Sequence, residues 1–149
     1  MTGSELRRGD YTISTDPARL DVDVIHAFLR EAYWSTGVTR EIVERSIEHS
    51  LVFGVYRGRE QVGFARVITD RAAIAYLGDV FILQEHRGHG LSKWLLEVIL
   101  EHPDLQDLRR FFLATKDAHG LYEQFGFRAL GDPSIFMSIE RSPSELYGD

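Results

Sequence analysis

The sequence has 149 residues, which is enough for one domain with its own hydrophobic core. It contains no cysteine, and this excludes disulfides, thiolate metal sites and a cysteine nucleophile. The formal net charge of −6 disfavours nonspecific binding to nucleic acid. No apolar stretch approaches the roughly 20 residues that span a bilayer, and residues 1–10 lack the apolar segment of a secretory signal. We therefore expect a single cytoplasmic domain over residues 1–149, with no membrane partner.

The first third of the chain predicts one strand and two helices. Residues 11–14 are a candidate strand, and Asp16 and Pro17 then give a helix-start signal. Apolar residues recur with helical spacing as far as Ala32. The loop over residues 33–37 ends this helix, and Thr39 is suited to cap a second one.

The middle of the chain changes to strand periodicity. Residues 51–56 and 61–68, separated by the polar turn 57–60, predict a β-hairpin. Residues 73–82 are rich in aromatic and β-branched side chains and predict a third strand. Together these segments predict an antiparallel meander.

The last part of the chain alternates between helix and strand. Residues 91–99 predict a strong helix that ends before Pro103, because the residue before proline disfavours helical geometry. Residues 110–115 predict a short buried strand, 118–125 a short helix, and 136–139 a final strand. The order of elements predicts an α+β architecture in which the meander is followed by a β-α-β crossover.

The segment over residues 79–93 is the most informative for function. It runs from a strand through a glycine-bearing turn into a helix, so the backbone N–H groups at Gly88 and Gly90 can approach a phosphate closely. Arg87 and Lys93 add positive charge. The segment matches neither the P-loop nor the Rossmann glycine pattern. The alternative interpretation is a tight left-handed turn that only joins strand to helix.

Two motifs in this sequence resemble those of the GCN5-related N-acetyltransferase (GNAT) superfamily. The first, residues 87–92, reads Arg-Gly-His-Gly-Leu-Ser and is similar to the family pattern [QR]-x-x-G-x-[GA]. The second, residues 115–127, is similar to N-x-x-A-x-x-L-Y-x-x-x-G-F. Ser92 stands where the family usually has Gly or Ala, and Thr115 replaces the usual Asn. The resemblance implies an α+β GNAT fold, with a mixed, mostly antiparallel sheet of six to seven strands flanked by about four helices.

The resemblance also implies direct transfer of an acetyl group from acetyl-CoA to a primary amine of a small molecule, with no metal. On this reading the pantetheine pairs with strand backbone like an added strand, the pyrophosphate sits on the glycine turn, and a strand N–H polarises the thioester carbonyl. The residues implied in cofactor binding are Val80, Phe81, Ile82, Arg87, Gly88, His89, Gly90, Leu91, Ser92, Lys93, Thr115 and Asp117.

The resemblance implies that Tyr122 is the catalytic general acid, which protonates the departing CoA thiolate. The alternative is a tyrosine that only packs beside Phe125 and Phe127. Asp79 is a candidate base, because some family members carry Glu-Asp where this chain has Gly78 and Asp79; its alternative is a hydrogen-bonded strand carboxylate. Further candidates for a base acting through water are Glu31, His26, His49 and His119.

Aromatic residues are candidates for the acceptor pocket, where they would suit a cationic amine. They are Tyr33, Trp34, Phe64 and Tyr76, of which Phe64 fits core packing better. His86 and His89 have a spacing that can hold a metal, but no third ligand is near them in the sequence.

Two other functions fit the same residues. One is a non-catalytic module that binds or senses acyl-CoA, and the other is acetylation of a protein N-terminus or lysine in an open groove. Exposed edge strands also make a homodimer reasonable.

Overall fold

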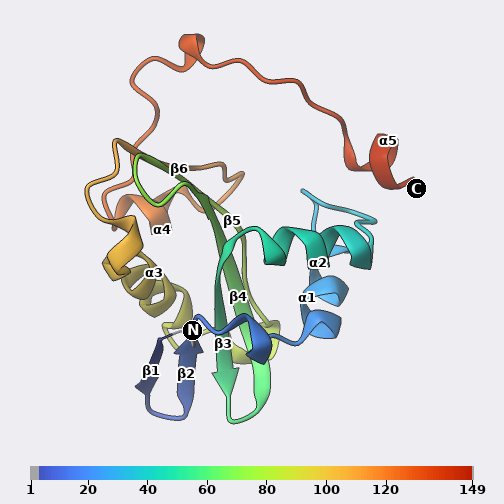
Figure 1. The fold of residues 1–149 in the computed structure, drawn as a ribbon, viewed down its shortest axis with the longest axis vertical. Coiled ribbons are helices and arrows are strands. Elements are labelled where there is room, and N and C mark those ends of the chain that lie inside the picture. The colour runs from blue at the N-terminus through green and yellow to red at the C-terminus, as the bar shows by residue number, and fades with distance from the viewer. Residues whose placement is uncertain (1–3, 149) are drawn as a thin grey trace.

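A computed structural model of the protein describes residues 4–148 and contains a single mixed sheet (Figure 1). The strands follow one another in chain order: β1 (Glu5–Arg8), β2 (Tyr11–Ser14), β3 (Leu51–Arg57), β4 (Glu60–Thr69), β5 (Ile74–Ile82) and β6 (Arg110–Leu113). Strands β1 to β5 pair antiparallel, whereas β6 joins β5 in parallel. The α+β fold with a mostly antiparallel sheet is confirmed.

Helices cover both faces of this sheet. They are α1 (Val22–Leu29), α2 (Arg40–Glu48), α3 (Leu91–Glu101), α4 (His119–Glu123) and α5 (Pro143–Tyr147). Figure 1 shows α1 and α2 on one side of the strands and α3 and α4 on the other. Asp21 caps α1, and Thr39 caps α2 by accepting a hydrogen bond from the Ile42 N–H. Each cap satisfies amides that the first helical turn leaves without an internal partner.

The two helical layers define two apolar clusters. Trp94, Leu95 and Ile99 of α3 pack against inward-facing strand residues such as Phe53 and Val55. The second cluster lies on the opposite face of the sheet, where α1 and α2 pack against it. Its buried residues are Ile25, Leu29, Val38, Val43, Val52, Phe64 and Phe81. Burying both faces explains why β3 reads as a continuous apolar run instead of an alternating one.

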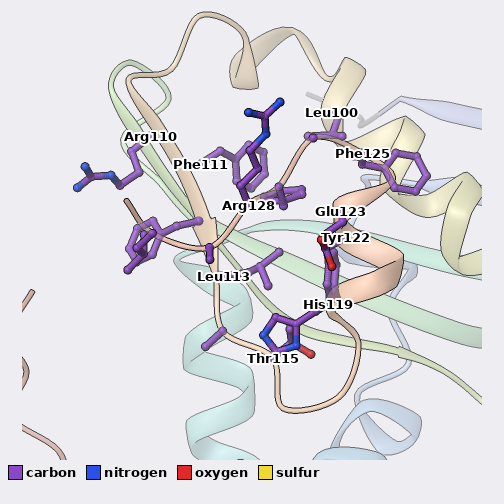
Figure 2. A pocket seen from close by; sticks show the side chains of 16 residues that line it. Leu100, Arg110, Phe111, Leu113, Thr115, His119, Tyr122, Glu123, Phe125 and Arg128 are labelled. Carbon is purple, nitrogen blue, oxygen red and sulfur yellow. The ribbon is translucent and has the colours of Figure 1, made fainter. Parts of the chain in front are cut away.

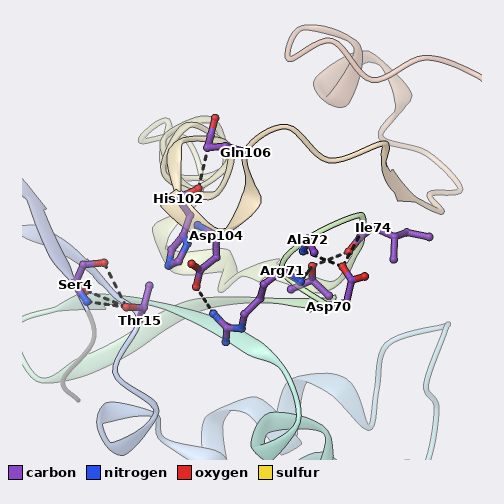
Figure 3. A network of polar contacts seen from close by, with 10 residues as sticks. Ser4, Thr15, Asp70, Arg71, Ala72, Ile74, His102, Asp104 and Gln106 are labelled. Carbon is purple, nitrogen blue, oxygen red and sulfur yellow. Dashed lines mark hydrogen bonds and ion pairs between the residues drawn. The ribbon is translucent and has the colours of Figure 1, made fainter.

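A polar network holds the end of the sheet near the β4–β5 turn (Figure 3). The Asp70 carboxylate accepts backbone hydrogen bonds from Ala72, Ala73 and Ile74, and these bonds lower the pKa of Asp70. Arg71, with a φ of 64°, forms an ion pair with Asp104 in the turn after α3. The turn is thereby tied to the segment that leads into β6.

The pairing of β5 with β6 is short, and this places the functional site. Register pairs run only from Ile74 with Arg110 to Leu77 with Leu113. Residues 78–82 of β5 continue along β4 but pair with no strand on the β6 side among residues 4–148. The two parallel strands therefore separate beyond Leu77 and leave a stretch of β5 backbone open to a ligand.

The predicted strand over residues 136–139 is wrong. These residues have no regular structure, and the chain after α4 runs off the sheet as a long arch that ends in α5 (Figure 1). Phe136 contacts the sheet, with the Arg110 guanidinium 4.8 Å from the centre of its ring. Residues 136–139 favour strand structure by composition, but they pair with no other strand among residues 4–148.

Other differences concern element ends. Strand β1 and helix α5 were not predicted, because β1 is charged and fully exposed and α5 is a five-residue element. Helix α1 ends at Leu29, before Ala32, and turns follow it. In residues 4–148, no helix has the length and apolarity needed to cross a membrane.

Candidate active site

The turn between β5 and α3 leaves backbone amides available. Gly88 and Gly90 have φ values of 86° and 73°, which glycine adopts without strain. Gly90 is the N-cap residue of α3 and makes no side-chain capping bond, so the first amides of the helix receive no acceptor from it. A Cβ at either glycine would meet nothing within 4 Å. The turn therefore leaves backbone amides open at a helix N-terminus, an arrangement that can bind an anion.

A cavity of about 380 Å³ lies at this turn. Its lining includes Arg87, Gly88, Gly90, Leu91, Ser92 and Lys93, together with His86, Ile82 and Leu121. Arg87 is fixed by its Nε–H, which donates to the Ile82 carbonyl over 3.0 Å. Nearly all the residues predicted to bind the pyrophosphate thus meet in one cavity; His89 packs instead against Tyr11, with ring centroids 6.0 Å apart.

Strand β5 carries an irregularity at Asp79. The register with β4 shifts between Phe64 and Arg66, and Asp79 takes a φ of 55°. A positive φ is costly for a residue other than glycine and marks a backbone held by its surroundings. The irregularity lies at the start of the open stretch of β5, beside Val80 and Phe81.

Both oxygens of the Asp79 carboxylate accept hydrogen bonds. The Trp34 Nε1–H donates to Oδ1 over 2.9 Å, and the Arg66 Nε–H donates to Oδ2 over 2.5 Å. Arg66 also donates to the Ser50 hydroxyl over 3.2 Å. The side chains of Asp79 and Arg66 are only 12% and 20% exposed. Sequence reasoning missed Arg66 and Ser50, because residues of β4 and the α2–β3 connection meet Asp79 only in the folded sheet.

The loop after α1 presents aromatic faces beside this network. Tyr33 and Trp34 are 54% and 41% exposed and pack edge to face with ring centroids 5.1 Å apart. The Lys116 ammonium lies 5.3 Å from the centre of the Tyr33 ring, close enough for a cation–π contact. Phe64 is completely buried and belongs to the core, so its placement in an acceptor pocket is excluded. Tyr76 packs on Phe112 at 5.0 Å.

A trough of about 750 Å³ lies between β6, α4 and the segment 125–130, and Figure 2 shows the side chains that line it. Tyr122 is 9% exposed there and packs edge to face on Phe127. Burial, with a smaller effect of Tyr33, raises the pKa of Tyr122 above 10. The phenol is therefore protonated at neutral pH. Because Leu121 lines the other cavity, α4 forms a wall between the two.

The remaining candidates are placed differently. Thr115 lines the trough and its hydroxyl accepts a hydrogen bond from the Ala118 N–H, while Asp117 is exposed and lines neither cavity. His119 lines the trough with Tyr122. The His26 Nε2 bonds to the Val38 carbonyl, Glu31 faces Arg30 at 3.9 Å, and His49 ends α2.

His86 and His89 both contact the Tyr11 ring. The Tyr11 hydroxyl lies 3.0 Å from the His86 Nδ1, and the rings of Tyr11 and His89 are tilted at 41°. In the part of the chain that the structure describes, no group of three metal-ligating side chains forms.

Comparison with known proteins identifies the family. The family model described as an acetyltransferase (GNAT) domain matches residues 48–129, which is more than half of the chain. This range includes β5, β6, α3 and α4, which contribute residues to the two cavities. The chain belongs to the GNAT acetyltransferase family. It is an acyltransferase. Both sequence motifs, residues 87–92 and 115–127, lie within the matched range.

Two relatives support the assignment of this chain to the GNAT acetyltransferase family. A Gibberella zeae protein that bears the name of an acetyltransferase, FG08082, is 37% identical and the match covers 77% of each chain. A GNAT-family protein from Xanthomonas campestris pv. campestris, known from a crystal structure, is 47% identical with a TM-score of 0.90, covering 93% of this chain and 97% of that one.

A more distant GNAT structure shares the fold. The acetyltransferase of Elizabethkingia anophelis, solved with acetyl-CoA bound, is 14% identical with a TM-score of 0.62. The match covers 81% of this chain and 78% of that one.

Proposed function

We propose that this GNAT acetyltransferase moves an acetyl group directly from acetyl-CoA to the primary amine of a small molecule, with Tyr122 as general acid. The observation that carries the proposal is the arrangement around α4. The open turn lies on one side of this helix and Tyr122 on the other, and Ile82, at the end of the β5 stretch that β6 does not cover, lines the cavity at the turn.

The anion turn suits the pyrophosphate of CoA. The N-terminal amides of α3 and the side chains of Arg87 and Lys93 provide donors and positive charge in one cavity. The related enzyme of Elizabethkingia anophelis was solved with acetyl-CoA bound. When bound, acetyl-CoA supplies an activated thioester, and residues 78–82 of β5 offer backbone groups to its pantetheine arm as a neighbouring strand would.

The proton for the departing thiolate comes from Tyr122 in this proposal. A buried phenol with a raised pKa holds its proton until a developing thiolate accepts it. A thiol with a pKa near 8.5 leaves moderately well unaided, so we expect general acid catalysis to contribute about 10²- to 10³-fold.

The acceptor in this proposal is a cationic amine that binds beside Tyr33 and Trp34. The chain's own Lys116 ammonium lies 5.3 Å from the centre of the Tyr33 ring, and this contact supports a primary ammonium group as a ligand of that face. An ammonium must lose a proton before it attacks. His119 lines the same trough as Tyr122, and we assign it to take this proton through water.

Asp79 has a different part in the proposal. Because both its oxygens already accept hydrogen bonds, it holds Trp34 and Arg66 in place and does not serve as the base. Composition favours a cytoplasmic enzyme, with acetyl-CoA and the amine as its partners.

The decisive experiment follows CoA release by the purified protein with a panel of aromatic and aliphatic amines, N-terminal peptides and lysine peptides. We expect release well above thioester hydrolysis with one class of small amines. A module that only senses acyl-CoA would bind the cofactor and release none above hydrolysis. Turnover confined to peptides would overturn the small-molecule assignment while leaving acetyl transfer in place.

A further inference from the structure

Lys116 is held by an aromatic ring and not by an acidic residue. The sequence contains two lysines, and the other, Lys93, lines the cavity at the glycine turn, where its charge suits the phosphates of the cofactor. Lys116 is exposed on the connection between β6 and α4, and among residues 4–148 its ammonium forms no ion pair with a carboxylate. It lies instead 5.3 Å from the centre of the Tyr33 ring. The side chain is therefore directed toward the aromatic loop after α1.

Contacts on both sides of this ammonium lead to the proposed site of acetyl transfer. On one side, Tyr33 packs on Trp34, and Trp34 donates to Asp79 at the start of the open stretch of β5. On the other side, Thr115 directly precedes Lys116 and lines the trough (Figure 2). Lys116 thus bridges from the end of β6 to the loop that is fixed to β5, and these are the two strands that separate.

The same ring lies close to the proposed general acid. Burial is the largest cause of the raised pKa of Tyr122, and Tyr33 adds to it. Electrostatic effects of this kind weaken with distance, so the Tyr33 ring lies near Tyr122. His119, the proposed base, lines the trough together with Tyr122. The Tyr33 ring therefore places the Lys116 ammonium in the neighbourhood of the residues proposed for acetyl transfer.

We propose that Lys116 is an acetylation site of the protein itself, and that its amine takes the acetyl group from acetyl-CoA bound to the same chain. This inference rests on the acetyl transfer proposed above. The Lys116 ammonium first loses a proton through water to His119. Its nitrogen then attacks the thioester carbonyl, the new N–C bond forms, the C–S bond breaks, and the CoA thiolate leaves with the proton of Tyr122. The products are an acetylated lysine, CoA and one proton released to water, so no further reactant is needed.

A tethered amine has an advantage over an amine from solution. Holding a reacting group near its partner raises its effective concentration and lowers the entropic cost of the reaction. Lys116 also rests on the ring face that we assign to the substrate amine, so the two compete for Tyr33. Acetylation removes the charge of the lysine and with it the cation–π contact. The modified side chain then leaves the Tyr33 face free for a substrate.

Mass spectrometry of the intact protein gives the first test. The purified protein is incubated with acetyl-CoA in the absence of any amine substrate. We expect one acetyl group per chain, which peptide mapping places on Lys116 and not on Lys93 or the N-terminal amine. Lys116→Arg, which keeps a cation for the Tyr33 face, should abolish the adduct. An unmodified Lys116, or equal acetylation of both lysines, would overturn the proposal.

Further variants separate catalysed transfer from chemical acetylation of an exposed lysine. Tyr122→Phe should slow the acetylation of Lys116 by about 10²- to 10³-fold, because the proton donor is lost. Tyr33→Leu should slow it by about 2- to 5-fold, because the ring face is lost, whereas Tyr33→Phe keeps the face and should retain the rate. Thermal unfolding should show that all variants are folded. A rate left unchanged by Tyr122→Phe, or equal rates in the two Tyr33 variants, would contradict the proposal.

Concentration dependence tests whether the transfer occurs within one chain. The rate constant for acetylation of Lys116 should not change with protein concentration. A tagged Tyr122→Phe chain mixed with the unmodified protein should stay unacetylated over the same time. Its acetylation at the rate of the unmodified protein would overturn transfer within the chain.

The panel of amines described above separates this inference from the proposed function. Turnover of an amine with Lys116 left unmodified would overturn the inference alone. Acetylated Lys116 with no turnover of any small amine would overturn the small-molecule acceptor alone. An unmodified Lys116 together with no release of CoA would overturn both.

Discussion

Trp34 and Asp79 lie 45 positions apart in the sequence and are joined by a hydrogen bond of 2.9 Å from the indole Nε1 to the carboxylate Oδ1. The bond fixes the aromatic loop after α1 to the irregularity in β5, at the start of the open backbone stretch. The other oxygen of Asp79 accepts from Arg66. One carboxylate therefore holds the loop in place and belongs to the strand residue with the positive φ.

Replacing Asp79 by Asn should affect the amine more than acetyl-CoA. The variant loses the ion pair with Arg66 and leaves that guanidinium largely buried, so we expect a loss of about 1–3 kcal/mol in the free energy of unfolding. The KM for the amine should rise while the KM for acetyl-CoA changes little. Trp34→Phe, which removes the Nε1–H donor together with part of the aromatic ring, should give the same split in KM with a smaller loss of stability. An unchanged amine KM in both variants would contradict the positioning role.

Replacing Tyr122 by Phe should lower kcat by about 10²- to 10³-fold while leaving the Kd for acetyl-CoA nearly unchanged. The ring and its packing on Phe127 are retained, and only the hydroxyl group is lost. An unchanged kcat would show that Tyr122 only packs. His119→Gln is a useful companion, since loss of the proposed base should lower kcat while the Tyr122 proton donor stays in place.

The alkaline limb of the kcat profile should also depend on Tyr122. General acid catalysis requires the protonated phenol, and burial raises the pKa of Tyr122 above 10. We therefore expect this contribution to persist through neutral pH and to fall only as pH rises past the raised pKa. Tyr122→Phe should lack that fall. If both proteins lose activity in parallel above pH ~10, another group controls the limb.

Replacing Gly90 by Ala tests the anion turn. A residue with a Cβ held at a φ of 73° should cost about 1–2 kcal/mol of stability, and the strained turn should bind CoA more weakly. Gly9→Ala is the matched control, because Gly9 has a φ of 58° and equally open surroundings in the β1–β2 turn. We expect the control to lose similar stability but to keep the Kd for CoA, measured by calorimetry. Equal Kd values for the two variants would argue against the turn as the cofactor site.

Replacing Tyr56 by Phe should stabilise the protein. The Tyr56 hydroxyl is buried and has no hydrogen-bond partner among residues 4–148, so removing it should gain about 1 kcal/mol in the free energy of unfolding. Burial raises the pKa of Tyr56 to about 12. The unfolded chain loses this proton first, so the stability of the unmodified protein should fall as pH rises from about 10 to 12.

Chemical denaturation at neutral and alkaline pH checks both statements about Tyr56. The Phe variant should show the smaller alkaline loss. Tyr11→Phe provides a contrast, because the Tyr11 hydroxyl has a partner in His86 and its removal should destabilise the fold.

Local patterns in the sequence determined much of this protein. The Thr39 cap, the strand runs over β3 to β5 and the glycine turn before α3 depend on neighbours within a few residues, and each was predicted. The helix start predicted at Asp16 and Pro17 begins only a short 3-10 turn, and Asp21 caps α1 instead. The two family motifs likewise placed Gly88, Gly90 and Tyr122 at their cavities, because strand, turn and helix follow one another directly in the chain.

Only the tertiary structure decided how distant residues meet. The partners of Asp79 come from a loop after α1 and from β4, and no local pattern joins them. The Phe64 side chain lies in the hydrophobic core because helices cover both faces of the sheet. Residues 136–139 have strand composition but pair with no strand in the described part of the chain, and a strand is completed only by hydrogen bonds to another strand. Sequence alone determines the propensity for such pairing, and the fold determines whether a partner is within reach.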